Sequence, residues 1–361
     1  MAPYVKAADA ATKPGTDVLV FTNGEKLVGT LDHEADGNVF FKSDNVGKVK
    51  VSWSKIKTLH TARPFAVLEK GALVKRHRSN FDVPIGFIVV NGDTLTVNTS
   101  GGTQQVPVKS IAYLVDHPTF EKNVLNGQSL WRGFTGTITA GTSLVYSTQN
   151  SRSVNTAVAL VRRVPAVTWL PPQGRTSLDF SSNFGQVTQV NTPTVKTNIV
   201  HGSLEQDEYF TRRFYALQQA VFDHNFSQGL DLQQLYGVGV GYTAIKDSKQ
   251  ELDLTGTMGY TKQQLSGTPE HDLIGSSFGD EYSRKFPRKI VFTQVGAFNP
   301  AWNRLEDYSS NLAANLSIPI FQGFGFTMGL VDSYLNDPPK GFKGNSVQFN
   351  TGLTYTLGGN R

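Results

Sequence analysis

Carboxylates that alternate with apolar residues are the side chains best placed to do chemistry in this chain. Glu251 and Asp253 flank Leu252, and Asp179 also lies between two apolar neighbours. Successive side chains of a β-strand point to opposite faces, so these carboxylates would face away from the apolar surface. In a closed barrel they would set ion selectivity at a constriction, or Arg partners would neutralise them in a salt-bridged plug. The predicted lumen-lining residues are Asp179, Glu251, Asp253, Asn315, Gln348 and Asn350.

The histidines and glycines form no catalytic motif. None of the seven histidines has the His-x-x-x-His spacing of a metalloprotease, and no Gly-x-Ser-x-Gly sequence occurs. Gly237, Gly239 and Gly241 lack the third spacing of a dinucleotide loop, and such alternation predicts a smooth inner wall or a bend. We expect no enzyme, cofactor or metal. A membrane hydrolase with a barrel-face Ser and His is the alternative, because strand facing does not reveal neighbours across a sheet.

Composition excludes several classes of protein. Hydrophobic residues make up 39% of the 361, and the absence of any run of about 18 apolar residues excludes a transmembrane helix. A β-barrel escapes that test because only every second residue faces lipid. The net charge of +5 is spread along the chain, so nucleic-acid binding is not expected. The absence of cysteine excludes a thiolate zinc site and fits export through an oxidising compartment.

Long alternating segments fill the second half of the chain. From Val347 to Leu357, apolar side chains share one face and Gln, Asn and Thr share the other. Strands of this length match the roughly 9 to 11 residues that a tilted strand needs to cross a bilayer, whereas soluble strands average about 5 to 6. The pattern predicts an all-β, antiparallel up-and-down transmembrane barrel of about twelve strands. The predicted strands are 133–148, 152–165, 175–188, 193–208, 212–226, 232–246, 250–265, 272–286, 289–299, 308–320, 323–335 and 345–357.

The connections between the later strands alternate in length. Those at 247–249 and 322–323 are short, whereas those at 266–271 and 336–345 are long and rich in Pro, Gly and charge. Outer-membrane barrels have short periplasmic turns and longer outer loops, so an even strand number would return both barrel ends to the periplasmic side. The sequence WLPPQG at 169–174 breaks this rule, because a short turn is expected there.

The first part of the chain predicts a small β-domain. Asn23-Gly24 and Asn91-Gly92 are tight-turn sequences in similar surroundings, which indicates two degenerate SH3-like repeats or one merged domain. Met1 to Lys6 lacks the apolar core of an export signal, so the chain is either a mature form with an added Met, which we favour, or a protein that is not exported. The predicted organisation is a flexible leader at 1–16, a small β-domain at 17–117, a linker with a helical turn at 118–130, the barrel at 131–357 and a tail at 358–361.

Two further groups of residues indicate contact with lipid. The basic cluster at 75–78 predicts an exposed loop or a contact with anionic headgroups or lipopolysaccharide. Aromatic residues near predicted strand ends match the girdles of membrane barrels, or alternatively the packing at the rim of a soluble barrel. They are Tyr209, Phe210, Phe286, Trp302, Tyr308 and Tyr334.

Two motifs resemble a known family. Tyr334 is followed by a polar gap, Pro338-Pro339 and Gly341 before the last strand, and Gly239-Val-Gly-Tyr follows an Asp-containing strand. Together they resemble the domain-of-unknown-function 481 family of Gram-negative bacteria over about residues 130–357. The resemblance implies an outer-membrane β-barrel with no established biochemical role. The chain departs from the pattern of outer-membrane strands in lacking a terminal aromatic. Either Tyr355 supplies this signal, or the barrel inserts in another manner.

These observations favour an outer-membrane barrel of structural or narrow-pore type, with a polar, plugged lumen and a periplasmic β-domain. About twelve strands leave little free bore, since open aqueous channels occur at about 16 to 18 strands. The alternative is a secreted or surface assembly subunit that polymerises or binds a partner by β-strand addition. Expected partners are outer-membrane lipid or lipopolysaccharide, the barrel assembly machinery, and a periplasmic protein or a second copy at the N-terminal β-domain.

Overall fold

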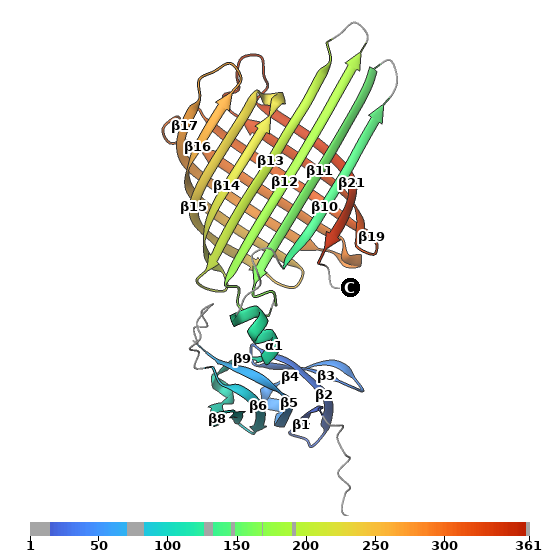
Figure 1. The fold of residues 1–361 in the computed structure, drawn as a ribbon, viewed down its shortest axis with the longest axis vertical. Helices are drawn as coiled ribbons and strands as arrows, with labels where there is room; N and C mark the ends of the chain where they lie inside the picture. The colour runs from blue at the N-terminus through green and yellow to red at the C-terminus, as the bar shows by residue number, and fades with distance from the viewer. Residues whose placement is uncertain are drawn as a thin grey trace, which may run out of the picture. The chain divides into compact units, whose positions relative to one another are not determined.

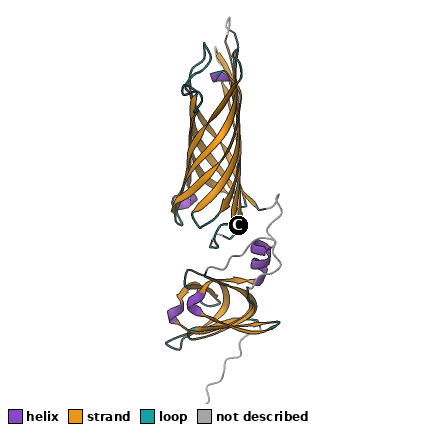
Figure 2. Cartoon of the chain, turned by 90° about the vertical axis from the view of Figure 1, so that its left-hand side faces the viewer, coloured by secondary structure: helices purple, strands orange, loops and turns teal. Residues whose placement is uncertain are grey.

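The computed structural model describes residues 15–70, 83–125, 133–145, 149–167, 169–189 and 193–358. They form two units: unit 1 is Met1–Gln128 with Val167–Leu170, and unit 2 is the remainder. Strands dominate both units (Figure 1, Figure 2). The leader up to residue 14, the basic cluster at 75–78, the linker residues 126–130 and the tail residues 359–361 lie outside the described residues. In the described part of the chain, no helix has the length and apolar character of a membrane span.

Unit 2 is a closed barrel of twelve antiparallel strands, which confirms the predicted fold class. Each strand pairs with the next along the chain, and the last pairs with the first through the register Gly136–Leu357 to Ala140–Leu353. Closure matters because an unpaired backbone amide in hydrocarbon costs several kcal/mol. The strands are β10 (Phe134–Val145), β11 (Gln149–Val164), β12 (Gly174–Gln189), β13 (Val195–Tyr209), β14 (Phe214–Asn225), β15 (Leu230–Lys246), β16 (Gln250–Leu265), β17 (His271–Lys285), β18 (Val291–Pro300), β19 (Tyr308–Phe321), β20 (Phe324–Leu335) and β21 (Asn345–Leu357).

The barrel wall is apolar outside and polar inside. On β21, the outward side chains of Phe349 and Leu353 are 68% and 65% exposed, while Thr354 on the inner face is 2% exposed. Large apolar side chains on the other strands are exposed in the same way, for example Met258 at 61%. This is the sidedness that the alternation predicts for strands that face lipid.

The aromatic girdle is confirmed only in part. Phe210, Phe286, Trp302 and Tyr334 are exposed near strand ends. Tyr209 is wrongly predicted, because its ring packs 4.8 Å from that of Tyr215, which is fully buried in the barrel interior. Tyr209 shares the inward register of the alternate residues on β13, and register decides its face.

The barrel has two distinct ends. One, the tight-turn rim, carries the short connections at 210–213, 247–249, 286–290 and 322–323. The other, the loop rim, carries the connections at 226–229, 266–270, 301–307 and 336–344. β10 begins and β21 ends at the tight-turn rim, as an even strand number requires (Figure 1).

Unit 1 is a single nine-stranded sheet in the order β4-β3-β2-β1-β5-β6-β7-β8, with β9 paired to β2 and β5. The two similar segments of this unit contain the turns Asn23-Gly24 and Asn91-Gly92. Each segment ends in a 3-10 turn, η1 (Trp53–Lys55) or η2 (Val108–Ser110), which is followed by β5 or β9. Because β5 pairs with β6, both segments belong to one sheet. The strands are β1 (Asp17–Phe21), β2 (Lys26–Ala35), β3 (Asn38–Ser43), β4 (Gly47–Ser52), β5 (Ile56–Glu69), β6 (Ile85–Asn91), β7 (Thr94–Thr99), β8 (Gly102–Pro107) and β9 (Ile111–Asp116).

Two apolar clusters hold unit 1 together. The larger includes Leu19, Leu59 and Phe65, all 0% exposed. The smaller contains Phe120 of the helix α1 (His117–Phe120), which continues as η3 (Glu121–Leu125), and also Leu170, 6% exposed. The ring of Trp169 stacks on His33 with centroids 4.1 Å apart. The segment after β11 is longer than a tight turn because its apolar side chains pack in this cluster.

Candidate functional site

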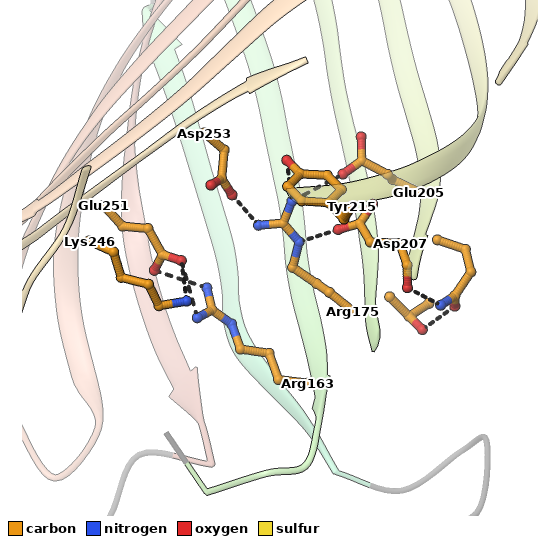
Figure 3. Close-up of polar contacts among 10 residues, drawn as sticks. Arg163, Arg175, Glu205, Asp207, Tyr215, Lys246, Glu251 and Asp253 are labelled. Carbon is orange, nitrogen blue, oxygen red and sulfur yellow. Dashed lines mark hydrogen bonds and ion pairs between the residues drawn. The ribbon is translucent and has the colours of Figure 1, made fainter. Parts of the chain in front are cut away.

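Arg175 is the centre of a charged network inside the barrel, close to the tight-turn rim. Its Nε donates to Asp207 Oδ2 at 2.5 Å, and its Nη1 donates to Asp253 (Figure 3). Its Nη2 donates to the Tyr215 hydroxyl at 3.1 Å and to Glu205 Oε1 at 3.5 Å. The Arg175 side chain is 5% exposed, so its charge is stabilised by these carboxylates rather than by bulk water.

A second cation crosses the lumen beside this network. Arg163 of β11 donates to both carboxylate oxygens of Glu251 on β16, at 3.4 and 3.2 Å. Lys246 of β15 approaches the same carboxylate at 3.4 Å. β11 and β16 are five positions apart in a ring of twelve strands, so this ion pair joins nearly opposite walls of the barrel (Figure 3).

The wall behind Arg175 is shaped by glycine. The Tyr215 ring lies flat against β15, where a Cβ at Gly241 would come within 2.2 Å of it. Gly237 and Gly239 also face inward, opposite Gln219 and Leu217. The alternate glycines therefore form the smooth inner wall that the sequence predicts, and this wall admits a tyrosine ring beside the arginine.

The loop rim also has contacts between opposite walls. Gln228 lies in η4 (Phe226–Gln228), between β14 and β15, and is 3% exposed. Its Nε2 donates to the backbone oxygens of Ser333 and Gly344 at 2.9 and 2.6 Å, and both acceptors belong to the region of β20 and β21. Leu230, Leu265 and Leu335 form a buried apolar cluster at the same end.

A recess of about 450 Å³, including the solvent at its opening, lies along β15 to β19. Its surface is made mostly of neutral polar side chains and of glycines such as Gly259 and Gly275. The side chains Gln233 and Gln263 bond to each other at 2.9 Å. The neutral polar lining includes Gln233, Thr257, Thr261, Gln263, Ser277 and Asn299.

The structure places all six predicted lumen-lining residues on the inner face. Glu251 and Asp253 belong to the two charged contacts described above, whereas Gln348 and Asn350 accept from Asn183 Nδ2 at 3.0 and 3.3 Å. Asn315 leans over Gly329 on the neighbouring strand. Asp179 lies opposite Ser203 and takes no part in the Arg175 contacts. That any of these residues binds or conducts an ion remains a prediction.

Sequence reasoning missed the cations of the site. Arg175 alternates with Ser177 and Asp179, and Glu205 alternates with Asp207, so the period-two pattern places these side chains on the inner face. It does not show that β12 and β16 approach each other across the lumen. The salt-bridged arrangement with Arg partners was anticipated, but the identity of the arginines was not.

One row of the inner wall carries the residue types that the hydrolase alternative would need. Ser181, His201 and Asp223 are directly paired across β12, β13 and β14, and His201 Nδ1 lies 2.7 Å from Asp223 Oδ1. Ser181 makes no hydrogen bond to His201 among the described contacts. A nucleophile needs its base within about 2.6 to 3.2 Å. The hydrolase remains a prediction without this geometric support.

Comparison with solved structures returns a porin and the translocator domain of an autotransporter. The porin NanC matches at 9% identity over 62% of this chain and 100% of its own, with a TM-score of 0.37. The translocator domain of the autotransporter NalP from Neisseria meningitidis matches at 11% identity over 62% and 87% of the two chains, with a TM-score of 0.32. No curated protein matches the chain.

The closed wall, apolar outer face and polar lumen define this protein as a β-barrel of the outer-membrane class. A family model matches residues 138–357, more than half of the chain. The protein belongs to this family, described as "Protein of unknown function, DUF481".

Proposed function

We propose that unit 2 is a narrow channel for small polar solutes and ions, restricted near the tight-turn rim by the Arg163 and Arg175 contacts. The observation that carries this proposal is the ion pair from Arg163 to Glu251, because it joins nearly opposite walls. The barrel lies in the outer membrane with its tight-turn rim on the periplasmic side, as the connection lengths support. The plug is thus made of side chains, and the lumen opens when they move apart.

The charges near the restriction favour cations. Three cations, Arg163, Arg175 and Lys246, lie with five carboxylates on the inner face. Rings of carboxylates in a narrow pore make cation passage favourable over anion passage. The five carboxylates are Glu205, Asp207, Glu251, Asp253 and Glu281.

Planar-bilayer conductance tests the proposal directly. Purified full-length protein should give a low conductance, with a reversal potential that indicates cation preference in a KCl gradient. Arg163→Gln should raise both the conductance and the cation preference, and Glu251→Gln should lower the cation preference. Arg152→Gln is the matched control, because Arg152 lies on the same strand with its side chain exposed on the outer face.

Two outcomes would contradict the proposal. One is that folded Arg163→Gln protein conducts no more than the wild type, which would indicate a purely structural barrel. The other is that Arg152→Gln changes conductance as much as Arg163→Gln. The proposal assigns no catalysis, and ester hydrolysis by the purified protein would favour the hydrolase instead.

A second candidate function, partner binding by strand addition, is favoured by the edge of unit 1. β8 pairs only with β7 among the described strands, and its outer segment Thr103 to Gln105 is uncharged. The opposite edge strand, β4, carries Lys48 and Lys50, which discourage strand pairing. We propose that a periplasmic protein or a second copy adds at β8. Gln105→Pro should abolish a complex seen in detergent, because the Gln105 N–H points away from β7. Lys50→Pro, at an outward N–H of the opposite edge, should not.

A further inference from the structure

Exposed cations concentrate in three connections of the tight-turn rim. Arg213 belongs to the first, Lys249 to the second, and Arg288 and Lys289 to the third; all four are exposed. Asp247 is the one acidic residue in these three connections, and its Oδ1 accepts from the backbone N–H groups of Lys249 and Gln250 at 2.7 and 2.9 Å. The Asp247 carboxylate is therefore engaged in its own turn.

The three connections are contiguous along the rim. Lys285 N donates to Lys249 O at 2.7 Å, which joins the end of β17 to the turn between β15 and β16. Thr243 N donates to Arg213 O at 2.8 Å, which joins β15 to the turn between β13 and β14. The cations thus form one band from β13 to β18, which we name the basic band and define as Arg213, Lys249, Arg284, Arg288 and Lys289.

The basic band is not neutralised by the barrel itself. Among the described residues, Lys249, Arg288 and Lys289 form no ion pair, in contrast to Lys246, which is paired with Glu251 in the lumen. Like charges that are crowded along one edge repel each other unless anions lie between them. An external anion is therefore the complementary partner of this edge.

Aromatic side chains place the basic band at the level of lipid headgroups. Phe210, Phe214 and Phe286 are 66%, 39% and 39% exposed at the same rim. The Arg284 guanidinium carbon lies 5.1 Å from the centre of the Phe286 ring. Exposed aromatic rings next to the apolar belt mark the membrane–water interface, and Lys and Arg beside them extend toward the headgroups.

The described connections of the loop rim have no such band. Lys262 is paired with Glu270 at 2.8 Å, and Arg304 is paired with Asp307 at 2.8 Å. Arg152, Lys196, Lys340 and Lys343 are also exposed at this end and form no ion pair among the described residues, but the acidic residues Asp231, Asp272, Glu306 and Asp337 lie exposed at the same rim. The excess of positive charge is therefore a property of one end of the barrel.

We propose that the basic band binds the phosphate headgroups of anionic phospholipids in the leaflet that the tight-turn rim faces. Charge and depth both match this partner, because an anionic phospholipid places its phosphate beside interfacial aromatics. Residues 1–125 do not provide the complementary charge, since they hold 15 Lys and Arg against 12 Asp and Glu. Each cation near an anionic surface raises association by about fivefold.

Electron paramagnetic resonance with spin-labelled lipids tests the proposal on full-length protein in phosphatidylcholine vesicles. The wild type should bind spin-labelled phosphatidylglycerol several-fold better than spin-labelled phosphatidylcholine. Arg288→Asn with Lys289→Asn should reduce this preference toward one. Asn tolerates the left-handed backbone of both positions, whose φ angles are 60°, so the turn is retained. Lys340→Asn with Lys343→Asn removes the same charge at the loop rim and should leave the preference unchanged.

Each result decides the proposal. Loss of preference in the tight-turn variant alone, together with weakening of the wild-type preference by salt, supports it. Equal loss in both variants would indicate a general charge effect and overturn it. A wild type that binds phosphatidylglycerol no better than phosphatidylcholine would also overturn it. So would a wild type whose tight-turn rim binds lipopolysaccharide as well as it binds phosphatidylglycerol. Wild-type conductance in both variants would show that the channel proposal is unaffected.

Discussion

The two units use the same alternation of apolar and polar residues with opposite sidedness. In unit 1, Leu59 and Phe65 point into the apolar core and are 0% exposed. In unit 2, Phe349 points outward from the barrel and is 68% exposed. A closed sheet of about eight strands is just filled by its side chains, but twelve strands enclose more space. Alternation therefore fixes which residues share a face, and strand number and surroundings decide which face is inside.

The units also differ in how they hold buried charge. In the barrel, Arg175 is bonded to several carboxylates. In unit 1, Glu34 is 0% exposed and accepts one backbone bond, from Gly37 N at 3.0 Å, while its Oε2 has no hydrogen-bond partner among the described atoms. Burial raises the pKa of the Glu34 carboxyl from 4.5 to about 7. An isolated buried carboxyl can become neutral, whereas an arginine must keep its partners.

The largest expected effect is the removal of Arg175. Arg175→Met leaves Asp207 and Asp253 buried without their cation, and we expect the free energy of unfolding of the barrel to fall by about 3 to 5 kcal/mol. Urea unfolding in lipid vesicles, followed by the shift of folded barrel on gels, measures it. Adding Asp207→Asn should restore part of the loss. A loss below about 1 kcal/mol, similar to that of Arg152→Met, would refute a stabilising role for the network.

A matched pair of arginines tests the sidedness of the barrel. Met258 and Val295 are both apolar and are 61% and 50% exposed, but Met258 faces outward and Val295 lies on the inner face opposite Glu281. Met258→Arg should lower stability in vesicles by about 2 to 4 kcal/mol, and Val295→Arg by less than about 1 kcal/mol. Equal losses for the two substitutions would contradict the assignment of the outer face to lipid.

The smallest effect concerns the pH dependence of unit 1. Between pH 4.5 and about 7 the unfolded chain has released the Glu34 proton while the folded unit retains it. Stability should therefore fall by about 2 to 3 kcal/mol as pH rises through this window, and stay level above it. Glu34→Gln should remove this slope. Thermal melting of the full chain, followed by Trp fluorescence, measures it, and an unchanged slope in the variant would assign it to another group.

The sequence predicted the barrel more fully than its site. Strand 250–265 was predicted at the bounds that the structure gives, because its alternation is strict and its flanking turns are polar. The same alternation of side chains predicted which residues lie on the inner face of the barrel, among them Asn315 and Gln348. The Arg163–Glu251 ion pair could not be predicted from the sequence, because it depends on which strands lie opposite each other after the barrel closes. The length of the 165–173 connection likewise reflects tertiary packing by Trp169 and Leu170.

The bare backbone at Gly241 has a consequence for variation in this protein. Even one added methyl group would overlap the Tyr215 ring, since the nearest ring carbons lie 2.2 Å from that position. Displacing the ring would also shift the hydroxyl that accepts from Arg175 at 3.1 Å. The geometry of the charged centre is thus set in part by a residue that has no side chain. Substitution of Gly241 would disturb the contacts of Arg175, which lies three strands away on β12.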